Sequence, residues 1–465
     1  MATSSSHPTL LLLLLLMLLV VVSKPLHALS LPPKTAKALI TTTTSTISSK
    51  SSGISKQSST LILPLKKQAV AATRKGPNKL LFHHNVSLTV TLSVGTPPQN
   101  VSLVLDTGSE LTWLRCNSSS ASPHFRPSAS ASYSSLPCSS PFCTSRARDL
   151  PVPAACDSSR RCHVSISYAD ASSSEGSLST DAFLVGQSPP LPTVFGCMDS
   201  AYSSSGEDAL TAGFLGMNRG ALSFPTQSDI RKFSYCISDI DSSGVLLIGG
   251  ESSPSLLPLV PPLNYTPLVE ISLPLPYFDR VAYSVQLEGI HVGDTLLPIP
   301  KSVLVPDHTG AGQTMVDSGT QFTFLLGPAY AALKSEFLRR TGRAGLRALG
   351  DPDFVFQGAF DACFLVREGA APPRGLPEVR LAFRGGAEVR VAGERLLYRA
   401  PGERRGPDGV WCLTFGNSDL VPMEAYVIGH HHQQNVWVEY DLENRRVGFA
   451  PVQCDLASRR LGLDL

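Results

Sequence analysis

The sequence predicts a mostly β protein made of two similar lobes, and three observations carry that prediction. Short segments of alternating apolar and polar residues, rich in β-branched side chains, recur from about Leu80 to the C-terminus. Helical periodicity is scarce, and the clearest helix is expected over 327–340. One stretch is written twice, at Val104–Leu114 and again at Met315–Leu325. At 465 residues the chain also exceeds one ordinary hydrophobic core.

Residues 1–28 are expected to be a secretory signal peptide. Leu10–Val22 is an unbroken apolar run of 13 residues, too short to span a bilayer, and small residues follow it around Ala28. The run lacks the usual basic residue before it, so a membrane anchor is the alternative. No later run approaches the length of a membrane span, so no membrane association is expected once the signal is removed.

Residues 29–79 are expected to be a basic, Ser/Thr-rich prosegment or linker. Met1–Leu105 holds ten Lys or Arg and no Asp or Glu, which leaves 39 − 10 = 29 basic against 37 acidic residues beyond it, a net charge of −8. A solvated basic tail would explain the positive charge of this N-terminal segment. A prosegment that covers an acidic cleft until carboxylates protonate would explain it equally well. The acidic body argues against nucleic-acid binding.

The folded body is expected to divide into an N-terminal β lobe at 80–262 and a C-terminal β lobe at 263–455, followed by a tail at 456–465. The Pro-rich stretch at 252–267 suggests the boundary. The segment NVSLTVTLSVGTPPQNVSLVLDTGS predicts a hairpin that leads into the first aspartate motif.

The duplication extends beyond these two stretches. An apolar-apolar-Gly landmark ending at Gly216 follows Asp106 by 110 positions, and one ending at Gly429 follows Asp317 by 112 positions. Landmarks at matching separations in both halves predict lobes of like topology related by a pseudo-twofold axis.

Each copy places an aspartate at the end of an apolar strand and a glycine two positions later: Asp106 with Gly108, and Asp317 with Gly319. The glycine allows either a positive φ or a close backbone approach. Facing across a pseudo-twofold axis, the carboxylates would meet and share one proton, so that one acts as base and the other as acid. A water between them could attack an amide carbonyl. This chemistry needs no metal, no cofactor and no Ser or Cys nucleophile.

The hydroxyls of the motifs fit the same chemistry. Thr107 and Ser318 are expected to donate to backbone across the lobe interface, and Ser109 and Thr320 to donate to the outer carboxylate oxygens. Apolar side chains near both motifs are expected to line the substrate subsites: Trp113, Phe322 and Phe324.

With these motifs the chain resembles the pepsin-like aspartic endopeptidases, specifically the plant nepenthesin type, over about residues 80–455. The resemblance implies a bilobal fold with a cleft between the lobes and catalytic roles for Asp106 and Asp317. It also implies that Tyr168 is the flap tyrosine that closes over substrate and that Trp113 is its partner beneath the flap.

The chain has ten cysteines, an even number that predicts five disulfides after a signal peptide. The cluster of Cys138, Cys143, Cys156 and Cys162 leaves a metal site as the alternative, although its spacings fit zinc poorly. Sequence alone does not choose among the pairings. The resemblance, which includes a Cys-rich insertion at 116–162, implies Cys116–Cys197, Cys138–Cys162, Cys143–Cys156, Cys236–Cys454 and Cys363–Cys412.

Three features depart from the family pattern. Two further cysteines common in the insertion are missing, Ala169 stands where the flap usually has glycine, and His430–His432 occupies a usually polar strip. The alanine is expected to alter flap mobility. A His triplet invites a metal or pH-sensor interpretation, against that of a polar loop near the cleft.

The expected function is hydrolysis of peptide bonds within polypeptides at acid pH by a monomer of the secretory pathway, in the endoplasmic reticulum lumen, the vacuole or outside the cell. The alternative is a catalytically inactive pepsin-like binding or inhibitor protein. Both aspartates and Tyr168 are present, which favours the enzyme. Four N-x-S/T triplets are candidate glycosylation sites: Asn85, Asn100, Asn117 and Asn264.

Overall fold

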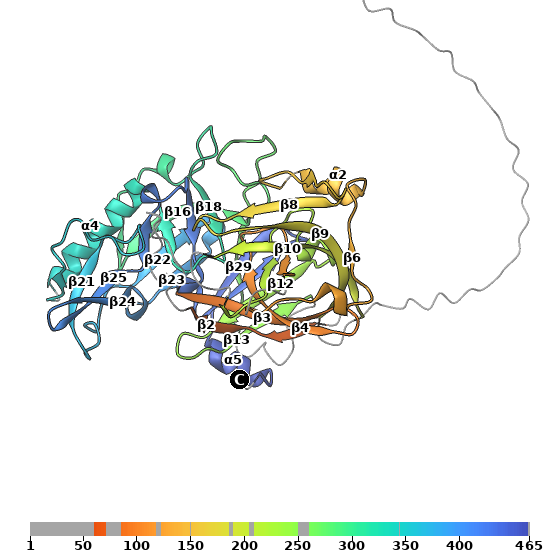
Figure 1. Ribbon diagram of the computed structural model, residues 1–465. Coiled ribbons are helices and arrows are strands. Elements are labelled where there is room, and N and C mark those ends of the chain that lie inside the picture. The colour runs from red at the N-terminus through yellow and green to blue at the C-terminus, as the bar shows by residue number, and fades with distance from the viewer. Residues whose placement is uncertain are drawn as a thin grey trace, which may run out of the picture. The chain divides into compact units, whose positions relative to one another are not determined.

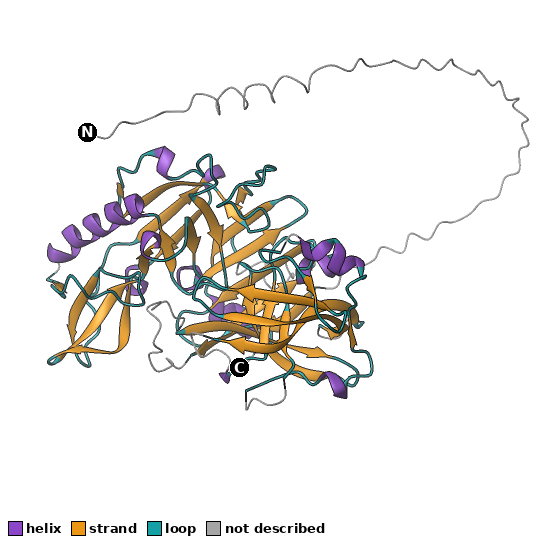
Figure 2. Cartoon of the chain, turned by 45° about the horizontal axis from the view of Figure 1, so that its top comes forward, coloured by secondary structure: helices purple, strands orange, loops and turns teal. Residues whose placement is uncertain are grey.

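A computed structural model of the chain describes residues 60–70, 85–117, 122–148, 150–185, 189–203, 209–249, 260–343 and 345–463. Strands dominate these residues, as predicted, and the helices lie around them (Figures 1 and 2). The expected signal peptide and most of the expected prosegment lie outside this description. Among the described residues, no helix combines the length and apolar character needed to cross a membrane.

The N-terminal lobe is built on one large sheet, called here the N-lobe sheet, with strand order β2-β3-β4-β11-β5-β10-β9-β8-β7 and β6 paired to β9. The alternating pattern of β3 buries apolar side chains at every second position from Leu88 to Val94. The predicted hairpin of β3 and β4 is confirmed. The strands are β2 Lys66–Ala69, β3 Val86–Val94, β4 Gln99–Asp106, β5 Trp113–Arg115, β6 Ser134–Ser135, β7 Ala155–Cys156, β8 Cys162–Ser167, β9 Ser173–Leu184, β10 Leu191–Tyr202 and β11 Gly213–Gly216.

The C-terminal lobe is built on the C-lobe sheet, with order β15-β18-β27-β19-β26, and on two flanking sheets, β17-β16-β22-β23 and β20-β21-β25-β24. The strands are β15 Ser284–Val285, β16 Leu287–Val292, β17 Thr295–Leu296, β18 Gln313–Val316, β19 Thr323–Leu325, β20 Arg347–Ala348, β21 Cys363–Arg367, β22 Val379–Phe383, β23 Glu388–Val391, β24 Leu397–Arg405, β25 Asp408–Leu413, β26 Phe415–Asn417 and β27 Ala425–Ile428.

The predicted helix is confirmed as α4, Gly327–Arg343, which packs against β16, β19 and β26 (Figure 1). Its buried face is formed by Tyr330, Leu333 and Phe337, spaced three and four residues apart. The other described helices are short: α2 Pro141–Thr144, α3 Phe224–Gln227 and α5 Cys454–Arg460. Single 3-10 turns occur at η1 Pro127–Ala129, η2 Arg146–Arg148, η4 Lys301–Val303, η5 Arg384–Gly386, η6 Gly393–Arg395, η7 Ser418–Leu420 and η8 His430–Gln433.

A third sheet, the connecting sheet, takes strands from both halves of the chain in the order β1-β13-β12-β28-β29-β14. Its strands are β1 Leu61–Pro64, β12 Lys232–Ile237, β13 Gly244–Ile248, β14 Asn264–Pro267, β28 Val436–Asp441 and β29 Arg446–Pro451. The expected tail at 456–465 is in part α5, which packs on β12 and β13 and buries Ala457.

The predicted repeat is visible in the strand pairing around each motif. In the N-lobe sheet, β11 runs parallel to β4 and antiparallel to β5, and in the C-lobe sheet β27 stands in the same relation to β18 and β19. The Thr112 hydroxyl accepts from the Gly216 N–H (3.1 Å), and the Thr323 hydroxyl accepts from the Gly429 N–H (3.2 Å). The two glycine landmarks therefore brace the two motifs in the same way.

Two strands precede the expected start of the N-terminal lobe at residue 80. β1 pairs with β13 at the edge of the connecting sheet, and β2 pairs with β3. Leu65 between them is 1% exposed and belongs to the main core. The segment expected at 29–79 as prosegment or linker therefore contains structural strands, because its apolar residues complete sheets formed by distant parts of the chain.

The described residues contain five disulfides. Those at Cys116–Cys197, Cys236–Cys454 and Cys363–Cys412 are as expected, whereas the insertion exchanges partners and forms Cys138–Cys156 and Cys143–Cys162. The expected pairs Cys138–Cys162 and Cys143–Cys156 are therefore wrong.

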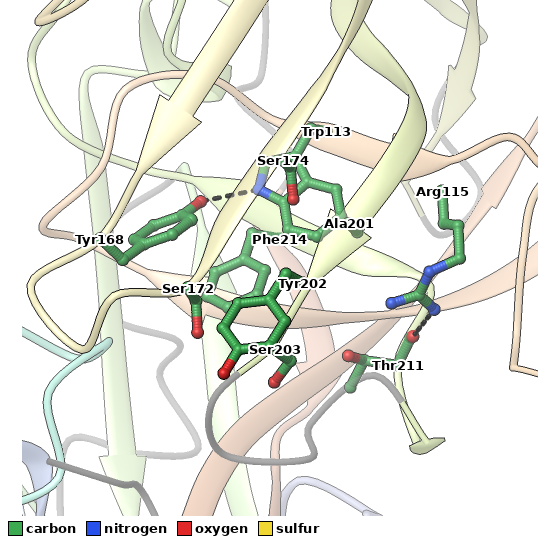
Figure 3. A pocket seen from close by; sticks show the side chains of 10 residues that line it. All are labelled: Trp113, Arg115, Tyr168, Ser172, Ser174, Ala201, Tyr202, Ser203, Thr211 and Phe214. Carbon is green, nitrogen blue, oxygen red and sulfur yellow. Dashed lines mark hydrogen bonds between the residues drawn. The ribbon is translucent and has the colours of Figure 1, made fainter. Parts of the chain in front are cut away.

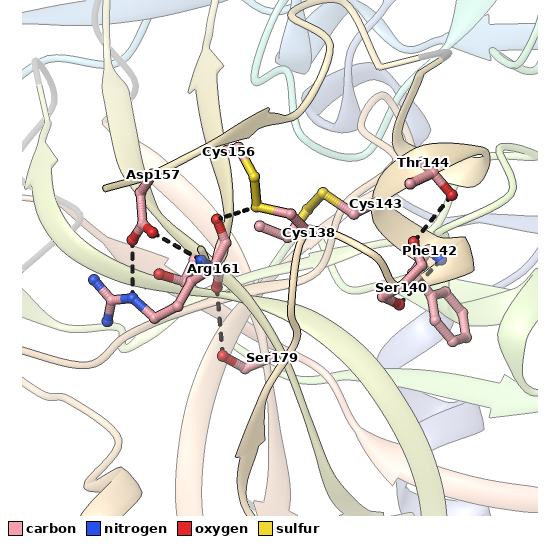
Figure 4. Close-up of a disulfide and its surroundings, with 11 residues drawn as sticks. Cys138, Ser140, Phe142, Cys143, Thr144, Cys156, Asp157, Arg161 and Ser179 are labelled. Carbon is pink, nitrogen blue, oxygen red and sulfur yellow. Dashed lines mark hydrogen bonds and ion pairs between the residues drawn. A yellow bond between two sulfur atoms is a disulfide. The ribbon is translucent and has the colours of Figure 1, made fainter. Parts of the chain in front are cut away.

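Burial explains the exchange of partners. Cys143 on α2 and Cys162 on β8 are both buried in one apolar cluster, while Cys138 and Cys156 lie nearer the surface, beside the Asp157–Arg161 ion pair (Figure 4). The disulfides fit folding in an oxidising compartment of the secretory route.

Candidate active site

The two aspartates end corresponding strands of the two lobes. Asp106 is the last residue of β4 and Asp317 follows the last residue of β18, and both are buried. Each carboxylate turns back onto its own loop: Oδ1 of Asp106 accepts from the Gly108 N–H and Oδ1 of Asp317 accepts from the Gly319 N–H, both at 2.9 Å. These bonds to backbone N–H groups fix the orientation of the two carboxylates.

Each aspartate is also in contact with the glycine of the other motif. A Cβ atom added to Gly319 would lie 2.2 Å from Oδ1 of Asp106, and one added to Gly108 would lie 2.8 Å from Oδ1 of Asp317. Neither glycine has a positive φ. Of the two reasons predicted for glycine here, close approach is therefore the one that applies, and it lets each carboxylate lie against the opposite loop.

The hydroxyls of Thr107 and Ser318 join the two loops reciprocally, as predicted. The Thr107 N–H donates to Oγ of Ser318 (3.0 Å), and the Ser318 N–H donates to Oγ1 of Thr107 (2.9 Å). Each hydroxyl then donates to the carbonyl before the opposite aspartate: Ser318 to Leu105 (2.8 Å) and Thr107 to Val316 (3.4 Å). Four buried bonds thus fix the loops to each other across the lobes.

The outer hydroxyls behave differently in the two halves. Thr320 donates to Oδ2 of Asp317 at 2.6 Å, as predicted. The Ser109 hydroxyl is buried and makes no hydrogen bond to any described residue, so the bond predicted for it is not formed. The pseudo-twofold symmetry therefore breaks at the two outer hydroxyls.

Tyr168 and Trp113 lie together, as predicted for a flap and its partner. Tyr168 begins the turn between β8 and β9, and its hydroxyl accepts from Nε1 of Trp113 at 2.7 Å (Figure 3). Phe214 stacks on both rings, with centroids 5.1 Å from Tyr168 and 5.2 Å from Trp113. These three aromatic residues form one wall of a pocket that is also lined by Arg115, Ser172, Ser174, Ala201, Tyr202, Ser203 and Thr211.

Sequence reasoning missed Phe214 and Arg115 at this pocket. Phe214 stands in the first glycine landmark, and its aromatic character was the signal, because the second landmark has Val427 in its place. Arg115 is buried at the end of β5 and donates to the carbonyls of Pro123 (3.1 Å) and Thr211 (3.3 Å). Nothing in its sequence neighbourhood distinguishes it from a surface arginine.

The backbone of the flap turn accommodates alanine at position 169. Ala169, which replaces the family's usual glycine, does not have a positive φ, so the backbone there suits alanine. The unusual position is Ala171, with a φ of 65°. Asp170 holds the turn by accepting from the N–H (2.9 Å) and the hydroxyl (2.8 Å) of Ser172.

Comparisons with known proteins agree with this geometry. Family models described as xylanase inhibitor N-terminal and C-terminal match residues 88–250 and 282–451. The aspartic proteinase PCS1 of Arabidopsis thaliana is 58% identical over 411 residues, 87% of this chain and 90% of that protein. This chain belongs to the pepsin-like aspartic proteinases. Within them it is of the nepenthesin type, since nepenthesin-2 of Nepenthes gracilis is 32% identical over 371 residues, 78% of this chain and 77% of that protein.

Solved structures share the fold of this aspartic proteinase. Conglutin gamma, a basic 7S globulin from lupine seeds, superposes with a TM-score of 0.62 at 21% identity, covering 86% of this chain and 98% of that one. At this level of identity the likeness shows the fold. It supports the expected bilobal β architecture.

The His triplet of this aspartic proteinase is a packed turn, η8, against the second motif. Nδ1 of His432 lies 2.7 Å from the Thr323 hydroxyl, and Nε2 of the same ring lies 2.7 Å from the Thr414 hydroxyl. Nε2 of His431 lies 3.0 Å from the Arg395 carbonyl oxygen. No cluster of His, Cys, Asp or Glu in the described ranges has an arrangement that could hold a metal ion. The triplet is therefore a largely buried turn instead of the polar loop expected near the cleft.

One of the four candidate glycosylation sites is wrong for the folded protein. Asn85 is 8% exposed, its side-chain nitrogen is buried, and its N–H donates to Oε1 of Gln321 in the other lobe (2.7 Å). A glycan would bond to that side-chain nitrogen, which is buried in the folded chain. Asn100, Asn117 and Asn264 are exposed and remain candidates.

Proposed function

We propose that this chain is an aspartic endopeptidase that hydrolyses peptide bonds in polypeptides at acid pH, with Asp106 and Asp317 as its catalytic dyad. The observation that carries the proposal is the reciprocal placement of the two carboxylates. Each lies against the opposite motif's glycine, and four hydrogen bonds hold the loops together.

The proposed reaction is general acid–base catalysis by a pair that holds one proton, as in other aspartic proteases. The ionised carboxylate takes a proton from a water, and the water oxygen attacks the amide carbon. The protonated carboxyl gives its proton to the carbonyl oxygen, producing a tetrahedral diol. Transfer of a proton to the amide nitrogen then lets the C–N bond break, which leaves a free amine, a carboxylic acid and the starting dyad.

Acid pH follows from the shared proton. Two carboxylates in contact repel when both are ionised, and with both ionised no acid remains to protonate the carbonyl oxygen. Activity should therefore fall as pH rises and the pair loses its proton. The flap tyrosine Tyr168, held by Trp113, would close over the substrate and exclude water from the cleft.

The second candidate is a catalytically inactive relative that binds another protein, because the matching family models are described as xylanase inhibitor domains. The retention of both aspartates, both motif glycines and the cross-loop hydroxyls favours the enzyme. An inhibitor would not need glycine at 108 and 319 to make room for the opposite carboxylate.

The proposed setting is the secretory pathway: the endoplasmic reticulum lumen, the vacuole or the extracellular space. Five disulfides and exposed sequons at Asn100, Asn117 and Asn264 support it. The enzyme is proposed to act as a monomer and to be made as a zymogen. Because β1 and β2 are structural, removal of the basic leader should end before Thr60 rather than near Leu80.

The test is cleavage of an unfolded protein such as casein between about pH 3 and pH 7, with an Asp106→Asn variant and with pepstatin added. Acid-dependent cleavage that the variant and the inhibitor both abolish is expected. If the purified protein, after acid treatment, leaves casein intact but binds a glycanase, the inhibitor assignment replaces this one.

A further inference from the structure

Beneath the two aspartate loops lie three buried side chains that the sequence analysis did not single out. Tyr235 lies on β12 and Tyr440 on β28, neighbouring strands of the connecting sheet. Gln433 is the last residue of η8, close behind the second glycine landmark. None of the three belongs to a repeated motif. Their polar atoms are nevertheless hydrogen-bonded to one another beneath the aspartate loops: Tyr235 to Gln433, and Tyr235 to Tyr440.

The amide of Gln433 fixes the direction of the hydrogen bonds. Its Nε2 donates to the carbonyl oxygens of Asp317 (3.2 Å) and Ile428 (2.6 Å), which can only accept. Its Oε1 must therefore be the acceptor, and the Tyr235 hydroxyl donates to it. The side chain of Gln433 thus carries a bond from the connecting sheet to the backbone of the second aspartate.

The same reasoning extends the chain to the first loop. With its proton directed to Gln433, the Tyr235 oxygen can only accept from the Tyr440 hydroxyl, 3.1 Å away. The Tyr440 oxygen in turn lies 3.5 Å from the Thr107 hydroxyl, whose one proton is shared between this oxygen and the Val316 carbonyl, 3.4 Å away. The Tyr440 hydroxyl proton has one alternative acceptor, the Val316 carbonyl, 3.4 Å away. In that arrangement Tyr440 bonds directly to the second aspartate loop.

Ring packing holds these hydroxyls in place. Tyr440 stacks on Phe233 with centroids 4.6 Å apart and contacts the Tyr283 ring at 4.3 Å. The Tyr283 hydroxyl donates to the Met217 carbonyl (2.7 Å), and the Met217 N–H donates to the Asp106 carbonyl (2.8 Å). Burial raises the pKa of Tyr235 and Tyr440 above its usual value, so both phenols remain donors.

We propose that Tyr235 and Tyr440 are positioning residues for the dyad. Through Thr107 on one side and Gln433 on the other, their hydroxyls set the separation of the two aspartate loops from below. The proposal rests on the dyad function proposed above. It adds a second connection to the reciprocal Thr107–Ser318 bonds, one that transmits the geometry of the connecting sheet to the carboxylates.

The experiment compares Tyr235→Phe, Tyr440→Phe and the double variant with wild type on a peptide substrate. Phenylalanine keeps the ring packing and removes the hydroxyl alone. Tyr265→Phe is the matched control, since Tyr265 is in the same sheet but donates to Glu439 (2.6 Å) rather than toward the loops. In the double variant kcat should fall about tenfold or more with KM within about twofold, while the control stays near wild type in both.

A purely structural role would not reproduce this pattern. Wider separation weakens the repulsion between the carboxylates, so the alkaline limb of the pH profile should move to lower pH in the double variant and stay in place in Tyr265→Phe. Gln433→Met, which removes the amide at similar size, should repeat the loss of kcat if the double variant is too unstable to assay. A kcat unchanged in all these variants overturns the positioning role and leaves the protease assignment standing. Absence of cleavage by wild type removes the protease assignment itself.

Discussion

Gly319 lies against the carboxylate of Asp106, across the boundary between the lobes, so closely that a Cβ atom on it would fall 2.2 Å from Oδ1. The corresponding contact of Gly108 with Asp317 is looser, at 2.8 Å. Each motif therefore provides the space for the other motif's aspartate. A change at one glycine acts on the carboxylate of the opposite lobe.

A methyl group at Gly319 should accordingly disable catalysis. We expect Gly319→Ala to lower kcat/KM by about a hundredfold or more, because a displacement of about 1 Å at a reacting group costs that much. Gly342→Ala is the control: Gly342 is in α4 with open space around it, and alanine there should raise stability by about 1 kcal/mol. Steady-state kinetics and thermal unfolding of both variants test this. An active Gly319→Ala enzyme would contradict the contact.

The Tyr168 hydroxyl should matter more for activity than for stability. Tyr168→Phe leaves the buried Nε1–H of Trp113 without its acceptor and frees the flap, so we expect about a tenfold loss in kcat/KM. The stacking on Phe214 is retained, so the free energy of unfolding should change by about 1 kcal/mol or less. Tyr330→Phe serves as the control for loss of a phenol hydroxyl. The hydroxyl of Tyr330 donates to Asp361 in the C-terminal lobe and has no part in the flap. Equal kinetics in both variants would argue against a flap role.

Two alanines of the flap turn should respond to glycine in opposite directions. Ala171 has a φ of 65°, a conformation that costs an L-residue about 1 kcal/mol, so Ala171→Gly should raise the thermal midpoint. Ala169→Gly, which restores the residue usual in the family, should lower it, because glycine there adds about 0.5–1 kcal/mol of backbone entropy to the unfolded state. Calorimetry on both variants decides. The same sign of shift in both would mean that the turn adopts another conformation.

The His triplet should make the protein less stable as pH falls. Burial lowers the pKa of His431 from 6.5 to about 4, so the unfolded chain binds the proton more readily than the folded chain. Stability from this group is complete above about pH 6.5 and is lost as pH falls toward 4, by about 2 kcal/mol for a partly exposed ring. His431→Phe, which keeps the contacts with Phe322 and Tyr398, should flatten that loss in urea unfolding at about pH 7 and about pH 4. The exposed His308→Gln should leave the pH dependence of wild type intact.

The strand that precedes the expected lobe boundary should be needed for folding. Leu65 is 1% exposed in the main core, so Leu65→Ala should cost about 3 kcal/mol of unfolding free energy. Lys66→Ala at the exposed neighbouring position should cost about 0.5 kcal/mol or less. Urea unfolding of the two variants measures the difference. Equal stability would mean that residues 61–69 behave as a detachable prosegment after all.

The repeat made much of the site predictable from sequence. Asp106, Asp317, Thr107, Ser318 and Thr320 occupy matching positions in two copies of one motif, and a duplicated motif at a strand end implies carboxylates that face each other. The β3–β4 hairpin and α4 followed from local sequence patterns. In these cases the signal lies within a few neighbouring residues.

What could not be predicted depends on contacts between distant segments. The pairs that the resemblance implied for Cys138 and Cys143 were wrong because burial in one apolar cluster brings Cys143 to Cys162. The strand role of Leu61–Ala69 depends on edges offered by β13 and β3. The Tyr235–Tyr440 connection joins residues 205 positions apart. No local pattern distinguishes these two tyrosines from ordinary core tyrosines, or the segment Leu61–Ala69 from an unstructured N-terminal segment.

The Cys236–Cys454 disulfide spans 218 positions and joins β12 to α5. A protease at high concentration also meets its own surface segments as substrates. Any cut between these two cysteines would produce two polypeptides that stay covalently joined and share one sheet. Such a nicked enzyme would migrate as a single species until its disulfides are reduced, and it could remain active. Self-digestion would therefore cut the chain without at once separating the fragments.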